Sequence, residues 1–269
     1  MSSNDPWSNA EFAIGFSHPF LNFLGVWPHN DIKYSKIYKI FSIFRFYFVQ
    51  LLCLSIILIP QTTKLYFAEG DLDLIIDILS TAVLPVVVAC MKIVAMRYNS
   101  EALSDLLDQI YADWQRSVTR QPDRILQMLS NARSGRRIAI LCIGVAYSTS
   151  AIFFVLRLVV MSRKQEQSFL MESHFPAACM LSPWFETLWF LQGVTTFVAT
   201  TAYAAIDGFF AVLVMHLCGQ FQQLTEDFCR LEVGREDWSR EMRKIVARHN
   251  ELNKLSHEKL LIAPIDDYL

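Results

Sequence analysis

One stretch of this sequence, residues 184–217, limits the possible folds of the chain more than any other. It holds 34 residues, and its only acidic side chains are Glu186 and Asp207. A helix needs about 20 apolar residues to cross the hydrocarbon core of a bilayer, and at ~1.5 Å per residue this stretch reaches about 50 Å. The stretch therefore predicts a membrane-spanning helix with length to spare at one end.

Three further apolar blocks, residues 38–59, 74–96 and 138–161, are long enough to span as well. Pro60 is expected to end the first helix and Pro85 to kink the second. A soluble helical protein is the competing interpretation, but four separate blocks and a mean hydropathy of +0.30 argue against it. We predict an all-α, polytopic membrane protein with four transmembrane helices and additional cytoplasmic amphipathic helices.

The distribution of basic residues predicts the orientation of these spans. With a cytoplasmic N-terminus, eighteen Lys and Arg residues fall on the inner side, in residues 1–37, 97–137 and 218–269 and at the start of the first span. Three fall on the outer side, in residues 60–73 and 162–183. The positive-inside rule thus places both ends of the chain in the cytoplasm. The net charge of −2 gives no indication of a nucleic-acid partner.

The segments predicted to be cytoplasmic carry amphipathic patterns. Residues 97–137 predict two helices separated by Pro122, and 218–269 predict a continuation of the fourth span followed by another helix from Asp237. Without further spans, the apolar faces of 101–114 and 237–252 are expected to stay partly unpaired. The residues on these faces are Leu103, Leu106, Leu107, Ile110 and Trp114; Ile125, Leu126 and Leu129; and Trp238, Met242, Ile245, Val246, His249 and Leu252.

Isolated charges and aromatic residues near the spans have ordinary explanations. Arg45, Asp77, Lys92 and Arg157 are close to span ends, where a long side chain extends to the polar phase. Asp207 lies deeper among small residues, so we expect it at a helix–helix contact, together with Gly208. Before the first span, an aromatic segment is expected to face lipid headgroups through Phe16, Phe20, Phe23, Leu24 and Trp27.

Motifs of enzyme chemistry are missing from the sequence. It has no glycine-rich phosphate loop, no nucleophile elbow and no set of His and Cys residues with zinc spacing. Its six cysteines fall mostly in spans or on the predicted inner side, so they form no disulfide framework. We therefore expect neither an enzyme nor a bound cofactor.

The run from Phe175 to Leu224 resembles the fourth span of insect odorant receptors. A proline-bearing outer loop leads into a long span with Gln192 near its outer end and Asp207 further along, and the span leaves through His-Leu-Cys-Gly-Gln at 216–220. The later run RKIVARHNELNKL is similar to a cytoplasmic helix of that family, and the resemblance covers about residues 10–255.

This resemblance implies a subunit of an odorant-gated cation channel in the plasma membrane. The partners would be a small volatile odorant, a co-receptor in a hetero-oligomer and membrane lipid. The odorant would bind between the outer halves of the second, third and fourth spans, with Gln192 at a helix contact. The implied ligand-binding residues are Ile78, Leu79 and Val83; Tyr147, Ser150 and Phe154; and Phe190, Val194 and Phe197.

That family has seven spans and this sequence predicts four, so we expect a receptor truncated after its fourth span that does not conduct on its own. Two alternatives stay open at this point. A gustatory receptor has the same architecture, and its diagnostic motif lies in the last span. A four-span membrane protein that binds full-length subunits without conducting is the alternative from a different functional class.

Overall fold

The computed structural model describes residues 11–28, 36–120, 122–164, 168–232 and 237–256, and all regular structure in these ranges is helical. Four continuous helical segments are long and apolar enough to cross a membrane: Lys36–Tyr66, Leu72–Tyr98, Arg124–Arg163 and Trp184–Cys229. The predicted all-α, four-span membrane fold is thereby confirmed. The positions of the membrane boundaries along these helices stay a prediction.

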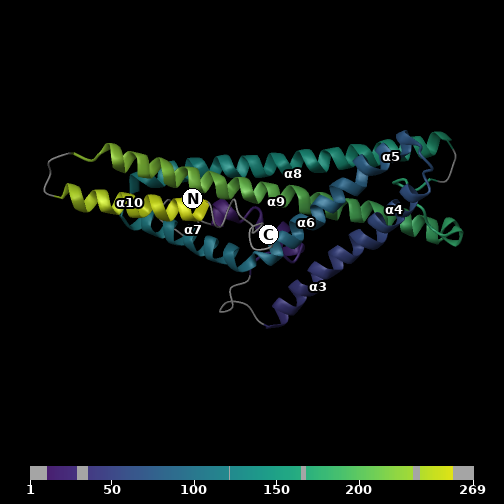
Figure 1. The fold of residues 1–269 in the computed structure, drawn as a ribbon, viewed down its shortest axis with the longest axis horizontal. Coiled ribbons are helices and arrows are strands. Elements are labelled where there is room, and N and C mark those ends of the chain that lie inside the picture. The colour runs from purple at the N-terminus through teal and green to yellow at the C-terminus, as the bar shows by residue number, and fades with distance from the viewer. Residues whose placement is uncertain (1–10, 29–35, 121, 165–167, 233–236, 257–269) are drawn as a thin grey trace.

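The two longest helices form an antiparallel pair that runs the length of the molecule (Figure 1). They are α8, Pro122–Lys164, and α9, Trp184–Cys229. Arg124 pairs with Asp227 at one end, and the Phe154 ring lies 5.0 Å from Trp189 near the other. At ~1.5 Å per residue, the 46 residues of α9 extend about 69 Å, well beyond a bilayer core of about 30 Å.

Small side chains on α9 explain how closely the pair packs. A Cβ added at Gly208 would lie 3.1 Å from both the Cα and the Cβ of Ala139 on α8, and one added at Gly193 would lie 2.9 Å from the Phe154 ring. Most of the apolar window of α9 is buried, 61%, against 11–24% for the other three candidate spans. The stretch 184–217 therefore forms the centre of the bundle, and the other helices surround it.

Each of the first two spans contains a π-helical turn directly before its proline. α3, Lys36–Cys53, continues through the π turn η1, Leu54–Leu58, into α4, Ile59–Tyr66. α5, Leu72–Ile78, continues through η2, Leu79–Val83, into α6, Leu84–Tyr98. A proline ring clashes with the carbonyl one turn earlier, and a wider turn accommodates it. The prediction that Pro60 ends the first helix is therefore wrong.

A second prediction is wrong at the start of α8. The short helix expected after Pro122 is not separate, because α8 runs without a break through the third span. Its first turns are anchored to the last turns of α9 by polar contacts between the two helices. Gln127 Nε2 donates to Glu226 Oε1 at 3.0 Å and Asn131 Nδ2 donates to Gln222 Oε1 at 3.0 Å.

The end of the bundle formed by these turns, called here the α10 end, also holds α7, Ser100–Arg120, and α10, Trp238–Lys254. Leu106, Leu107, Ile110 and Trp114 of α7 are buried, and Leu252 of α10 is fully buried. The predicted amphipathic face of α7 is confirmed. The expectation of a partly unpaired face is therefore wrong for 101–114, which packs into the bundle. It holds for 237–252, where Val246 is 49% exposed and His249 is exposed.

A buried carboxylate holds α7, α9 and α10 together at this end. Asp113, 4% exposed, accepts from Arg248 Nη2 at 2.7 Å and lies 3.3 Å from His216 Nε2. Burial alone would lower the pKa of Arg248, but Asp113 and Glu251 outweigh burial, so the pKa is raised. Arg248 also donates to Gln220 Oε1 at 2.8 Å. This network of charged and polar residues thus joins three helices inside one chain.

The N-terminal aromatic segment packs into the bundle. It contains the short helix α2, His18–Phe23. Leu24 is fully buried, and the Trp27 ring lies 5.9 Å from Phe209 of α9. The expectation that these two residues face lipid headgroups is therefore wrong, whereas Phe23 is half exposed.

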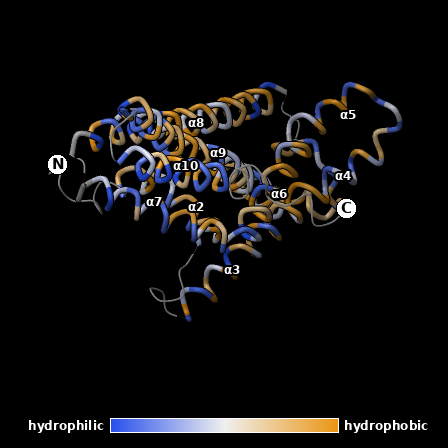
Figure 2. Tube along the Cα trace, turned by 60° about the vertical axis from the view of Figure 1, so that its left-hand side comes forward, coloured by the Kyte–Doolittle hydropathy of each residue, from blue (hydrophilic) through white to orange (hydrophobic). Residues whose placement is uncertain are grey.

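Large apolar side chains are exposed on α3 and α8, and the tube of α8 is largely orange in Figure 2. Ile37, Phe44 and Leu51 of α3 and Leu141, Val145 and Ile152 of α8 are each at least 60% exposed. An exposed apolar surface of this extent suits contact with lipid tails. Hydrophilic residues are instead frequent on α7 and α10.

Candidate ligand-binding site

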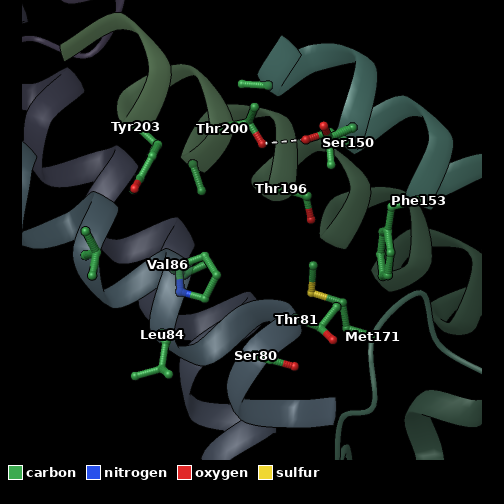
Figure 3. Close-up of a pocket in the computed structure, with 15 residues that line it drawn as sticks. Ser80, Thr81, Leu84, Val86, Ser150, Phe153, Met171, Thr196, Thr200 and Tyr203 are labelled. Carbon is green, nitrogen blue, oxygen red and sulfur yellow. Dashed lines mark hydrogen bonds between the residues drawn. The ribbon is translucent and has the colours of Figure 1, made fainter. Parts of the chain in front are cut away.

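A cavity of about 580 Å³ lies between α6, α8 and α9 (Figure 3). It is near the end of the bundle opposite α10, called here the loop end, where residues 168–183 connect α8 to α9. Its volume is within the range of small-molecule sites, about 300–1,000 Å³. The lining residues are Ser80, Thr81, Leu84, Pro85, Val86, Val88, Ala146, Thr149, Ser150, Phe153, Met171, Thr196, Ala199, Thr200 and Tyr203.

Helical spacing brings these residues onto three facing stripes. On α9, Thr196, Thr200 and Tyr203 recur every three or four residues, and on α8 Ala146, Thr149 and Phe153 do the same. The third stripe begins at the π turn η2 and continues past Pro85 into α6. The wide turn and the proline therefore shape one wall of the cavity.

The lining is neutral and mostly apolar. None of the described lining residues carries a charge, and the polar groups are hydroxyls. Several of these hydroxyls donate within their own helix: Ser80 to the Ile76 carbonyl at 2.6 Å, Thr149 to Val145 at 2.9 Å and Thr196 to Gln192 at 2.8 Å. Ser150 and Thr200 instead bond to each other across α8 and α9 at 2.8 Å.

The connecting loop closes the cavity at the loop end through Met171, whose thioether points into the space between Thr81 and Thr196 in Figure 3. Gln192, fully buried on α9, donates to Ser173 Oγ at 2.9 Å and accepts from the Met171 amide at 3.5 Å. The His174 amide also donates to the Pro60 carbonyl at 2.9 Å. The loop is therefore fixed over the cavity from two sides.

Ion pairs between helices flank the cavity. Arg157 of α8 lies 3.2 Å from Asp77 of α5 and 4.0 Å from Glu172 in the loop. Lys92 of α6 pairs with Asp207 of α9 at 2.6 Å, and its Nζ is 3.7 Å from the centre of the Tyr203 ring. Asp77, Lys92 and Arg157 are thus each paired with another segment, and their reach to the polar phase stays a prediction.

The residues predicted for helix contacts each touch another segment in the structure. Asp207 bonds to Lys92, Gly208 packs on Ala139, and Gln192 holds the loop. These contacts join α9 to α6, to α8 and to residues 171–173. The interior of α9 is thus in contact with every wall of the cavity.

Among the nine residues predicted to bind a ligand, Ser150 lines the cavity. Tyr147, Phe154 and Phe197 form an aromatic cluster beside it, with ring centres 6.3 Å and 6.4 Å from Phe197, and the Tyr147 hydroxyl bonds to Thr201 at 2.6 Å. Ile78 and Val83 are buried against the bundle, Leu79 is half-buried, and Phe190 and Val194 are exposed, 66% and 37%. A ligand contact by these eight residues stays a prediction.

Sequence reasoning missed the other fourteen lining residues. One signal was available: Thr196, Thr200 and Tyr203 place polar groups on a single face of an apolar helix at helical spacing. The position of Met171 had no such signal, because it depends on how the loop folds back onto Gln192.

Comparison with known proteins identifies the family of this chain. A family model described as 7tm Odorant receptor matches residues 74–259, more than half of the chain and all of the residues that line the cavity. Curated proteins gave no significant match. This is a family of membrane receptors rather than of enzymes. With its four spanning helices and its neutral cavity between them, the chain belongs to the 7tm odorant receptor family.

Proposed function

We propose that this chain binds a small volatile odorant in the cavity between α6, α8 and α9. The observation that carries this proposal is a neutral, largely apolar space of about 580 Å³ inside the region matched by the odorant receptor family. Apolar walls with a few placed polar groups suit small ligands of low polarity. The family itself points to small volatile odorants as ligands.

The walls divide into contact residues and supporting residues in this proposal. Ser150, Thr196, Thr200, Phe153 and Met171 would touch the odorant, because they line the cavity. The aromatic cluster of Tyr147, Phe154 and Phe197 would support the α8 and α9 stripes from behind. No enzymatic step is part of this function.

The chain would act as a receptor subunit of an odorant-gated cation channel in the plasma membrane, in a hetero-oligomer with a co-receptor and with its N-terminus in the cytoplasm. The distribution of basic residues supports the orientation. The exposed apolar faces of α3 and α8 support contact with lipid or with another membrane subunit. A four-span protein that only binds other subunits is the alternative tested below.

Filling the cavity tests the binding site. Ala146 lines the cavity on α8, whereas Ala151 on the same helix is exposed and outside it. We expect Ala146→Trp to abolish saturable odorant binding by the purified chain in lipid nanodiscs, measured by saturation-transfer NMR, and Ala151→Trp to preserve it. Equal binding by both variants would remove the cavity as the site.

Channel function is tested separately by whole-cell recording from cells that express this chain with an odorant receptor co-receptor. An odorant-evoked current that requires this chain and is lost in Ala146→Trp would support the receptor subunit. Binding of the co-receptor without any odorant-dependent current would favour the interaction protein.

A further inference from the structure

The hydroxyl groups of the cavity differ in whether their hydrogens are already used in hydrogen bonds within the protein. Seven lining residues carry a hydroxyl. Ser80, Thr149 and Thr196 donate to backbone carbonyls of their own helices, and Thr81 donates to Asp77 Oδ1 at 3.0 Å. These four present oxygen lone pairs to the cavity, but their hydrogens are already engaged.

The Ser150 and Thr200 hydroxyls differ from these four, because together they hold one hydrogen more than their hydrogen bond uses. They share one hydrogen bond at 2.8 Å, in which either hydroxyl is the donor. Two hydroxyls hold two hydrogens and one is used in this bond, so one remains whichever residue donates. The described residues offer this pair no further hydrogen bond, and both side chains are half-buried in the cavity wall.

A hydrogen-bond acceptor on a bound ligand would satisfy that remaining hydrogen. A half-buried donor without a partner is costly, and a ligand with a suitably placed acceptor relieves this cost while a ligand without one does not. No described lining residue is charged, so nothing in the wall compensates an ionised ligand. The polar group of the ligand would therefore be a neutral acceptor.

We propose that the Ser150–Thr200 pair is the specificity-determining donor of the cavity and selects small neutral ligands that carry a carbonyl oxygen, such as ketones, aldehydes and esters. This inference rests on the proposed odorant site between α6, α8 and α9. It adds the position of the ligand oxygen, at the contact of α8 and α9, and leaves the carbon chain against Phe153, Met171 and Val86.

Tyr203 is the remaining lining hydroxyl and provides the main internal competitor. Its side chain is 43% exposed, and Lys92 Nζ lies over its ring rather than at its oxygen. This exposure distinguishes Tyr203 from the half-buried pair at the contact of α8 and α9. In Figure 3 Tyr203 lies to the left of Thr200, one turn further along α9, so the variant Y203F tests directly whether its hydroxyl is the donor instead.

The experiment uses the purified 269-residue chain in nanodiscs with 2-heptanone carrying carbon-13 at its carbonyl, and heptane as the matched ligand without an acceptor. Infrared difference spectra report the carbonyl stretch of bound ketone, and saturation-transfer NMR reports the affinity of both ligands. We expect a stretch at lower wavenumber than for the ketone in lipid. S150A/T200V should remove this shift and weaken ketone binding about threefold to tenfold, with heptane affinity unchanged.

The control variants separate this proposal from the site itself. T195V on α9 and S148A on α8 each remove a hydroxyl that donates to a backbone carbonyl and lies outside the cavity, so both should retain the shift. An unshifted carbonyl in bound ketone, a shift that survives S150A/T200V, or a shift lost in Y203F would overturn the pair as donor while the site stands. Absence of saturable binding of both ligands would overturn the site and the pair together. Circular dichroism of each variant confirms that it folds.

Discussion

Paired charges rather than isolated ones mark the interior of this bundle. Lys92 and Asp207 come from helices 115 positions apart in sequence and meet at 2.6 Å beside the cavity residue Tyr203. The lipid core offers no water to a lone charge, so removal of one partner leaves the other without compensation. This pair therefore joins α6 to α9 at the residue scale.

Removing one member of the pair should destabilise the chain. We expect Lys92→Met to lower the free energy of unfolding by about 1–3 kcal/mol, less than for a fully buried pair, since the Asp207 side chain is 40% exposed. Lys92→Met combined with Asp207→Leu should recover most of the loss. Reversible unfolding in mixed micelles measures Lys92→Met, Asp207→Leu and the double variant. A loss in the double variant equal to the sum of the two single losses would contradict the pairing.

His18 gives the N-terminal segment a pH dependence. Burial lowers the pKa of His18 from its ordinary value of 6.5, and Glu11 opposes this only in part. A lowered pKa in the folded state means that protons favour the undocked segment, so its stability is complete above pH 6.5 and falls as the pH drops below it. Hydrogen exchange in α2 should accelerate between pH 7.5 and pH 5.5.

Replacing His18 tests whether its imidazole is the group that causes this pH dependence. In His18→Asn the exchange of α2, corrected for the intrinsic pH dependence of amide exchange, should no longer change across that range. An unchanged acceleration in the variant would assign the titration to another group. The edge-on contact of His18 with Trp27, 4.7 Å between ring centres, makes the tryptophan fluorescence a second readout.

At the scale of elements, close approach of α8 and α9 depends on positions where a side chain has no space. Gly208 is such a position, with Ala139 backbone and side-chain atoms 3.1 Å from an added Cβ. Gly144 on α8 is the matched opposite, since an added Cβ there meets nothing within 4 Å. Two glycines in the same helix pair thus have different roles.

Substitution at these glycines should have opposite signs. Gly208→Val should cost about 1–3 kcal/mol, because neither helix backbone moves without disturbing the whole pair. Gly144→Ala should be neutral or add up to about 1 kcal/mol through helix propensity. Thermal unfolding of the two variants in one lipid environment compares them, and a stable Gly208→Val would show that the pair is not closely packed.

Elements were easier to predict from the sequence than the contacts between them. Apolar length and helical spacing identified four spans and the buried face of α7, because bilayer thickness and helical periodicity act locally. Pro60 misled the prediction, since a π turn absorbs the clash that would otherwise end the helix. The place of Ser150 on the cavity followed from the family resemblance, whereas Thr200 and Met171 depend on packing between distant segments.

The whole molecule is an elongated bundle with different chemistry at its two ends. The α10 end gathers the charged residues of α7, α9 and α10, with Asp113 and Arg248 at their centre. The loop end carries the cavity and residues 168–183 that cover it. We infer that the α10 end is cytoplasmic and that the cavity lies on the outer side, which native cysteines on the two sides make testable.

An impermeant maleimide applied to intact cells should label Cys179 in the loop and leave Cys218 and Cys229 at the α10 end unlabelled. Permeabilised cells should show labelling at the latter two, which are exposed in the structure. Asp73→Cys supplies a second outer site. Peptide mass spectrometry resolves the three native thiols, and labelling of Cys229 in intact cells would invert the proposed orientation.

Photoaffinity labelling tests the central claim, that an odorant binds between α6, α8 and α9, most directly. A ketone bearing a diazirine on its carbon chain is bound to the chain in nanodiscs, irradiated, and located by peptide sequencing. The account predicts labels on cavity residues such as Phe153, Met171 and Val86, competed away by unlabelled ketone and absent in Ala146→Trp. Labels confined to the exposed faces of α3 and α8, without competition, would contradict it.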